Sequence, residues 1–218
     1  ELTGMRKSIA SHMKNSLSST AQLSFFLELD VTDVQQKRKS FSKENDTAIT
    51  MAHILIKACI ESLKRHPEFN TVLSEGKIGH YNDINIGFAV AIKGGLIVPV
   101  INNAGNKNIS EIIRDSDLLA EKAREGKLTP EEVGGGTFTI SVLGSVDGFT
   151  PILNAGQSAI LGVGRSVEKP IVKKGDIVIR EMMTLSLTVD HQVIDGAAAA
   201  SFLRRLQQIL ARPQSLLV

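Results

Sequence analysis

The stretch MMTLSLTVDHQVIDG, residues 182–196, decides how the rest of this chain is organised. Its first half alternates apolar and polar side chains, the period-two pattern of a β-strand with one buried face. His191 and Asp195 follow four residues apart, and Gly196 precedes a helical pattern over residues 197–210. A histidine at a rigid strand exit suits a catalytic base because imidazole titrates near neutral pH, although such a histidine can equally be structural.

Composition and charge limit the classes of protein to which the chain can belong. The chain has 218 residues, of which 42% are hydrophobic, and it contains no apolar run of the roughly 18 residues that a membrane span needs. We therefore expect one globular domain over residues 1–218, with no membrane contact. The 25 basic and 23 acidic residues are interspersed, which argues against nucleic-acid binding. The single cysteine, Cys59, excludes an intramolecular disulfide and favours a reducing compartment.

Periodicity and capping signals predict the order of helices and strands. An N-terminal amphipathic helix carries Ile9, Met13 and Leu17 on one face that should pack against the protein, and Thr32 or Asp33 should cap a short helix. Strands are predicted over residues 23–31, 84–92, 96–101, 137–143, 159–163 and 177–180, and further helices over residues 35–40, 47–65, 112–126 and 197–210. We expect Asp46 or Thr47 to cap the second of these helices, and Asn108 or Ser110 the third.

The glycine-rich segments do not predict a nucleotide site. Three consecutive glycines at residues 134–136 precede a strand, whereas the phosphate-binding fingerprints precede a helix, and the GVG at residues 162–164 lacks the remaining fingerprint residues. His53 and His66 have no second ligand-type residue at metal-binding spacing, so no metal site is expected. Most of the later strands form hairpins without regular helical crossovers. This order predicts an α/β sandwich on a mixed, largely antiparallel sheet.

The strand, the HxxxDG string and the helix after it resemble the signature of the dihydrolipoamide acyltransferases of 2-oxo acid dehydrogenase complexes. The segments MRKSIASHM (5–13), INIGFAVAIKGGLIVPV (84–100), GGTFTISVLG (135–144) and FTPILNAGQSAILGVG (149–164) resemble catalytic-domain segments of that family, in the same order. The resemblance covers nearly the whole chain. It implies the chloramphenicol-acetyltransferase-like two-layer sandwich, and acyl transfer between dihydrolipoamide and coenzyme A, both as substrates.

The resemblance assigns roles to individual residues. His191 would be the base that deprotonates a thiol of pKa about 8.5, and Ser141 would donate a hydrogen bond to the tetrahedral oxyanion. Asp195 would fix the turn by pairing with an arginine, for which Arg6 is the candidate, and Gly196 would let the helix start close to the strand. Ser141 can also be interpreted as a strand-end serine that binds only backbone.

The chain departs from the family pattern at several positions. Gln192 stands where many members have arginine, Val142 replaces a common asparagine, Ala155 and Gly156 replace a proline pair, and the loop over residues 144–148 is short. These departures concern acyl specificity. The string DHQ at residues 190–192 resembles the corresponding string in the acyltransferases of acetoin-cleaving complexes. Two alternatives stay open. One is a non-catalytic scaffold, which would be expected to lose these site residues, and the other is a stand-alone chloramphenicol-acetyltransferase-like enzyme, which usually has HHxxxDG where this chain has Asp190 before the histidine.

The resemblance also implies an assembly and a location. Family members form homotrimers with active sites between subunits, the trimers build a 24-mer or 60-mer core, and E1 and E3 components join through upstream domains. We expect the apolar segment Leu216, Leu217 and Val218 to dock one trimer on the next. Cytoplasm is expected in a bacterium, or the mitochondrial matrix in a eukaryote.

Overall fold

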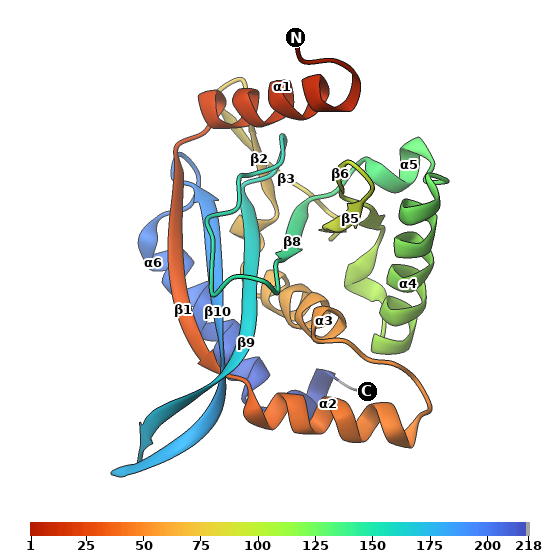
Figure 1. Ribbon diagram of the computed structural model, residues 1–218. Coiled ribbons are helices and arrows are strands. Elements are labelled where there is room, and N and C mark those ends of the chain that lie inside the picture. The colour runs from red at the N-terminus through yellow and green to blue at the C-terminus, as the bar shows by residue number, and fades with distance from the viewer. Residues whose placement is uncertain (217–218) are drawn as a thin grey trace.

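The computed structural model describes residues 1–216 as a sheet of six strands covered by helices (Figure 1). The sheet has the order β1 (Gln22–Asp30), β10 (Asp176–Asp190), β9 (Ala159–Lys173), β8 (Phe138–Val142), β4 (Ile86–Phe88) and β7 (Val100–Ile101). The helices are α1 (Gly4–Ser19), α2 (Thr32–Glu44), α3 (Met51–Leu63), α4 (Ile109–Glu125), α5 (Pro130–Val133) and α6 (Gly196–Leu210). The structure therefore confirms the predicted α/β sandwich.

The sheet is mixed, as predicted. β10 pairs antiparallel with β1 and β9, whereas β8 runs parallel to both β9 and β4, and β4 pairs antiparallel with β7. Two small ribbons, β2 (Thr71–Ser74) with β3 (Lys77–His80) and β5 (Val90–Ile92) with β6 (Gly95–Ile97), lie outside it. The predicted hairpin around Gly94 is thus confirmed, although its strands divide between the main sheet and the second ribbon.

β9 and β10 are each 15 residues long, which is longer than the sequence pattern indicated. The strand predicted at residues 177–180 and the strand that leads to His191 are one continuous element. Their ladder is interrupted only by a register shift between Met183 and Leu185. Antiparallel pairing of two strands this long holds the turn after residue 190 at a defined place at the end of the sheet.

Both faces of the inner part of β10 are buried, so the prediction of one buried face was wrong. Leu185, Leu187 and Val189 belong to the hydrophobic core, but Ser186 and Thr188 on the other face are also almost inaccessible. Residues 144–158 cover this second, polar face. Gly162 and Gly164 make the close approach possible, because a Cβ on Gly162 would meet the Pro151 ring at 3.1 Å and one on Gly164 would overlap the Asp147 carbonyl group.

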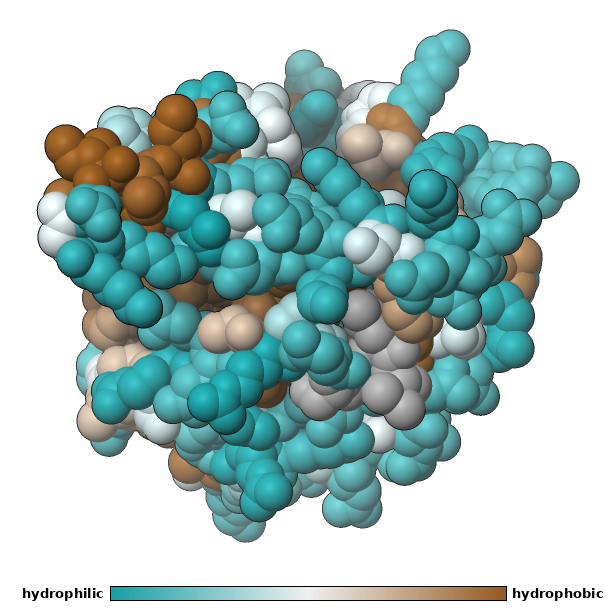
Figure 2. All heavy atoms as spheres, turned by 90° about the horizontal axis from the view of Figure 1, so that it is seen from below, coloured by the Kyte–Doolittle hydropathy of each residue, from teal (hydrophilic) through white to brown (hydrophobic). Residues whose placement is uncertain are grey.

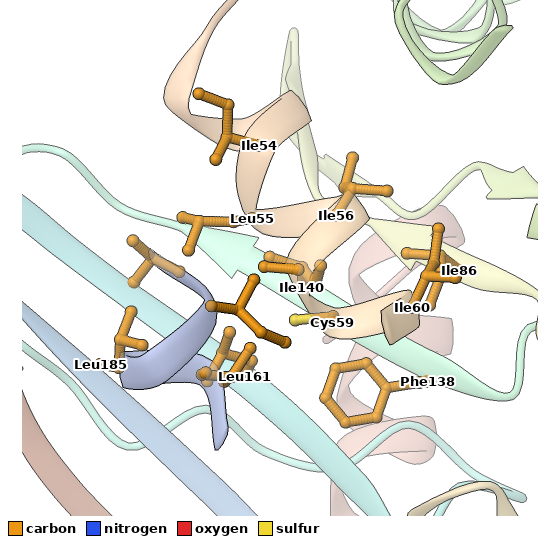
Figure 3. Packing of buried hydrophobic residues seen from close by; sticks show 14 of the residues in the cluster. Ile54, Leu55, Ile56, Cys59, Ile60, Ile86, Phe138, Ile140, Leu161 and Leu185 are labelled. Carbon is orange, nitrogen blue, oxygen red and sulfur yellow. The ribbon is translucent and has the colours of Figure 1, made fainter. Parts of the chain in front are cut away.

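The core lies between the sheet and the helices α3, α4 and α6. Figure 3 shows its centre, where Cys59 and neighbouring apolar residues of α3 face the strands. The labelled residues are Ile54, Leu55, Ile56, Cys59 and Ile60 of α3, with Ile86, Phe138, Ile140, Leu161 and Leu185 of the strands. Burial of Cys59 raises the pKa of its thiol, so this side chain acts as core packing.

α3 begins at a different cap from the one expected. Thr50, rather than Asp46 or Thr47, accepts a hydrogen bond from the His53 backbone N–H, and the Thr50 N–H donates to Nδ1 of His53 at 3.2 Å. Nε2 of His53 lies 3.3 Å from Asp117, and burial lowers the pKa of the imidazole although Asp117 opposes this. His53 is therefore a structural residue that completes a capping box.

The cap predicted for α4 is confirmed, whereas the caps predicted for α2 are wrong. Asn108 caps α4 as one of the two predicted alternatives, with Glu111 completing the box. α2 begins after Val31 instead of being capped by Thr32 or Asp33. α1 is helical as predicted, but its apolar face is only partly covered: Met13 is half-buried, whereas Leu17 is 52% exposed.

The β9–β10 hairpin extends beyond the end of β1 (Figure 1). Several apolar side chains of this projecting part are exposed. Val172, Ile177 and Ile179 are 74%, 79% and 71% exposed. Figure 2, viewed from the end of the molecule at which the hairpin projects, shows a contiguous apolar cluster on the same side. Apolar patches of this kind more often mark contact surfaces than free solvent faces.

The C-terminal prediction is partly wrong. Leu216, in the short 3-10 helix Pro213–Leu216, is fully buried in the core of its own chain and is not available to dock another trimer. Leu217 and Val218, the other two residues of that prediction, lie outside the described residues.

Replacing Gly164 with alanine should destabilise the fold, because the new Cβ would push residues 146–147 off β9. We expect Gly164→Ala to lower the free energy of unfolding by about 1–3 kcal/mol, as overpacked core sites do. Gly144→Ala is the matched control, since a Cβ there meets nothing within 4 Å. Chemical denaturation of both variants checks this, and equal stabilities would contradict the close approach.

Candidate active site

His191 occupies a turn that directly follows the last residue of β10. Its backbone N–H donates to the Ala21 carbonyl at 2.8 Å, which extends the β1–β10 contact by one residue. Two further backbone bonds close the turn, from the N–H groups of Val193 and Ile194 to the Asp190 carbonyl. The imidazole is exposed. The structure therefore holds the backbone of the predicted base rigidly while leaving its side chain accessible.

Asp190, one residue before the histidine, is the functional candidate that the sequence analysis did not assign to the site. Its carboxylate is almost inaccessible, and its Oδ1 accepts from the N–H of Ala21, the N–H of Gln192 and the side-chain amide of Gln192, each at 3.1 Å. No ion pair of Asp190 occurs within residues 1–216. A signal was present in the sequence, since Asp190 continues the polar phase of Ser186 and Thr188.

Asp195 caps α6 instead of pairing with Arg6. Its Oδ1 accepts a hydrogen bond at 2.8 Å from the Ala198 N–H, an N-terminal cap. Arg6 is exposed, and in the part of the chain that the structure describes neither residue takes part in an ion pair. The structure thus does not bring Arg6 and Asp195 together within one chain, and the contact that it shows for the Asp195 carboxylate is the cap.

Gly196 is less constrained than the sequence suggested. A Cβ at this position would lie 3.6 Å from the Phe25 ring, an ordinary van der Waals contact. The start of α6 does not require a glycine within this chain.

Ser141 lies near the end of β8 and lines a cavity of about 310 Å³. The cavity is closed on one side by Met13 of α1 and elsewhere by the β5–β6 region and residues 149–154. Its apolar lining consists of Met13, Ala89, Leu96, Val98, Phe149, Pro151, Ile152 and Ile160, and its polar lining of Thr139, Ser141, Thr150 and Asn154. A hydroxyl group on the wall of a mostly apolar hollow suits a substrate with an apolar tail and one polar reacting centre.

A hydrogen-bond network fixes the polar wall of this cavity. The Thr139 hydroxyl donates to Gln157 Oε1 at 2.8 Å and accepts from the Asn154 amide at 2.9 Å. The amide of Gln157 in turn donates to the Gly136 carbonyl at 2.9 Å. Because Thr139 is two residues from Ser141 on the same strand, the network restrains the strand face that presents the Ser141 hydroxyl.

Strand register separates His191 from Ser141 within one chain. Ser141 is aligned with Gly162 of β9, and Gly162 with Ser186 of β10. His191 is five residues beyond Ser186, roughly 16 Å along the strand direction at about 3.3 Å per residue. The structure thus brings both residues to one sheet but not to one point.

No cluster of three or more histidine, cysteine, aspartate or glutamate side chains within residues 1–216 could hold a metal ion. In the same part of the chain no helix is both long and apolar enough for a bilayer crossing.

The fold is that of the chloramphenicol acetyltransferase class. A solved chloramphenicol acetyltransferase superimposes with a TM-score of 0.57 over 91% of this chain and 94% of that one, at 16% identity, which shows the shared fold. The sequence then places the chain more narrowly. It belongs to the family of 2-oxoacid dehydrogenases acyltransferase (catalytic domain), which it matches over residues 1–218.

Individual relatives are similar along the whole chain. It is 40% identical over 225 residues to the dihydrolipoyllysine-residue acetyltransferase component of the pyruvate dehydrogenase complex of Staphylococcus epidermidis, and it spans 52% of that relative's length. A probable dihydrolipoamide acetyltransferase from Listeria monocytogenes is 36% identical, with a TM-score of 0.92 over 97% of this chain and 93% of that one. The same identity and TM-score hold for the Azotobacter vinelandii dihydrolipoamide acetyltransferase, over 100% of this chain and 94% of that one.

Removing the Asp195 carboxylate should destabilise the turn through the loss of a helix cap. We expect Asp195→Ala to lower stability by about 1 kcal/mol and Asp195→Asn to be close to neutral, because asparagine caps a helix as well as aspartate. Thermal unfolding of the three proteins measures this. If Asp195→Asn were as unstable as Asp195→Ala, the negative charge rather than the cap would be the stabilising feature.

Proposed function

We propose that this chain catalyses transfer of an acyl group, acetyl in the first instance, between dihydrolipoamide and coenzyme A. The imidazole of His191 takes the proton from the attacking thiol, and the resulting thiolate adds to the thioester carbonyl. The Ser141 hydroxyl donates a hydrogen bond to the oxyanion of the tetrahedral intermediate. When the intermediate collapses, the C–S bond of the original thioester breaks, and the departing donor thiolate receives the proton from His191.

Membership of the acyltransferase catalytic-domain family, with His191 delivered from a rigid strand exit, carries this proposal. Among the described residues the imidazole has no hydrogen-bond partner, so its ring nitrogens are available to a thiol. The apolar cavity beside Ser141 suits an acyl chain, and a hydroxyl donor on its wall suits the oxyanion. Each of these features is one that a thioester exchange needs and a passive scaffold does not.

A solved relative supports the assignment of roles. In the Azotobacter vinelandii enzyme a serine, a histidine and an asparagine have been investigated for their roles in the catalytic mechanism. That histidine and asparagine are four residues apart, as His191 and Asp195 are here, and the serine precedes the histidine by 52 residues there and by 50 here. The third position differs, with Asp195 replacing asparagine, and both residue types can cap α6.

We propose that each active site forms between two copies of the chain. The roughly 16 Å of strand between His191 and the level of Ser141 prevents one subunit from supplying both groups to one reacting carbon. A homotrimer would join the histidine of one subunit to the serine of the next. A 24-mer or 60-mer core is the further assembly, since a similar solved structure is the cubic core of a pyruvate dehydrogenase complex.

The remaining partners follow from the size of the relatives. The chain spans about half the length of the staphylococcal proteins that it matches, so we propose that E1 and E3 components bind elsewhere in a longer protein. Coenzyme A and lipoamide enter as substrates, without a metal. A bacterial cytoplasmic complex is the setting that the bacterial relatives favour.

Substitution of His191 or Ser141 should impair acyl transfer without changing the assembly of the protein. We expect His191→Ala to abolish acetyl transfer from acetyl-CoA to dihydrolipoamide, and Ser141→Ala to lower kcat by about 100-fold to 1000-fold with little change in either KM, because an oxyanion donor acts in the transition state. Steady-state kinetics on variants of wild-type particle mass tests both. Substantial turnover by His191→Ala, or a Ser141→Ala defect confined to KM, would refute the assigned roles.

Mixing the two impaired variants should restore activity if sites form between subunits. A mixed trimer joins the intact His191 of the Ser141→Ala chain to the intact Ser141 of the His191→Ala chain. We expect co-expressed variants to regain a substantial fraction of wild-type kcat, while variants mixed without subunit exchange keep no more than the residual activity of Ser141→Ala. No recovery in mixed trimers verified by mass spectrometry would place both groups in one subunit and contradict the register argument.

A further inference from the structure

The side chain of Gln192 makes a pair of hydrogen bonds that the acyl-transfer chemistry does not use directly. Its Nε2 donates to the Ser19 carbonyl at 3.1 Å and to Oδ1 of Asp190 at 3.1 Å, while Oδ2 of Asp190 lies at 3.3 Å. The backbone N–H of Gln192 donates to the same Oδ1. One exposed side chain thus connects the last turn of α1 to the buried carboxylate before His191.

The bonds of Gln192 lie just beyond the last residue pair of the β1–β10 ladder. The β1–β10 ladder ends at the pair of Gln22 with Asp190, so the His191 residue is beyond it. One backbone bond, from His191 to Ala21, links its main chain to the neighbouring strand. Asp190 adds its bond to the Ala21 N–H, and Gln192 adds the bond to α1. Side-chain bonds of Asp190 and Gln192 therefore add to the backbone bonds that hold the turn on both sides of His191.

α1 is itself anchored to the wall of the Ser141 cavity. The buried Ser16 hydroxyl donates to the Leu153 carbonyl at 2.6 Å, and Gln22 bonds both Ser16 and the Leu153 N–H. Met13, one turn earlier, lines the cavity. Through Gln192 the histidine turn is thus attached to the same helix that borders the serine cavity of its own chain.

We propose that Gln192 is a positioning residue for the His191 base. Its amide N–H group fixes the turn against α1 and against the Asp190 carboxylate, and the imidazole is thereby presented to the substrate thiol in one orientation. This inference rests on the proposed function of His191. Its effect should appear in kcat, because orientation of a base acts on the chemical step, with little effect on substrate binding.

The sharpest test replaces only the donor. Gln192→Glu keeps the size of the side chain but puts a carboxylate against Asp190 and the Ser19 carbonyl. We expect kcat to fall about tenfold, with both KM values within about twofold of wild type, since small misplacements of a catalytic group have effects of this order or larger. Gln192→Arg restores donors that reach both acceptors and should keep kcat within about threefold of wild type.

Gln207→Glu, the same chemical change on an exposed position of α6, is the matched control and should leave kcat unchanged. Hydrogen exchange of the peptide that covers residues 188–195 should be faster in Gln192→Glu than in wild type, at an unchanged thermal midpoint. Unchanged kcat in Gln192→Glu, failure of Gln192→Arg to retain activity, or equal exchange in Gln192→Glu and wild type would overturn the proposal. An inactive wild type would refute the proposed function instead. The hydrogen-exchange comparison would even then test whether Gln192 stabilises the turn.

Discussion

The buried carboxylate of Asp190 closes the junction at which the start of β1, the end of β10 and the turn before α6 meet. A charged group in such a place is costly unless donors surround it, and here backbone and amide N–H groups supply them without a cation. Truncating this side chain would remove the acceptor of the Ala21 and Gln192 N–H groups, which lie on two separate segments. The hydrogen bonds that Asp190 accepts therefore help to set the position of the backbone that carries the accessible imidazole.

The covering of the polar side of the sheet explains why β9 carries glycines at residues 162 and 164. Residues 144–158 cross over β9 and β10 at backbone contact distance, and Gly162 and Gly164 leave the space for them. The same crossing segment supplies Phe149, Pro151 and Asn154 to the cavity of Ser141. One close approach of backbone to strand thus both buries the second face of the sheet and forms the wall of the substrate cavity.

Much of this architecture was predictable because it depends on local pattern. The alternation before His191, the Asn108 cap and the turn at Gly94 are short-range signals, and each gave the right element. The candidate residues at 141, 191 and 195 came largely from resemblance to a known family, which no periodicity could replace. The buried second face of β10 and the burial of Leu216 were missed because both depend on segments remote in the sequence. The cap role of Asp195 is a local contact with Ala198, and it was missed because the arginine pairing was expected instead.

The projecting part of the β9–β10 hairpin has a thermodynamic consequence. An isolated two-stranded ribbon is marginal in water, and this one exposes Val172, Ile177 and Ile179 beyond the support of β1. If the proposed assembly covers it, ordering of the ribbon and association of subunits become one linked equilibrium, in which the free energy of assembly includes the free energy of ribbon formation. The melting temperature of the purified protein would then rise with its concentration, as for any protein whose fold is completed by its neighbours.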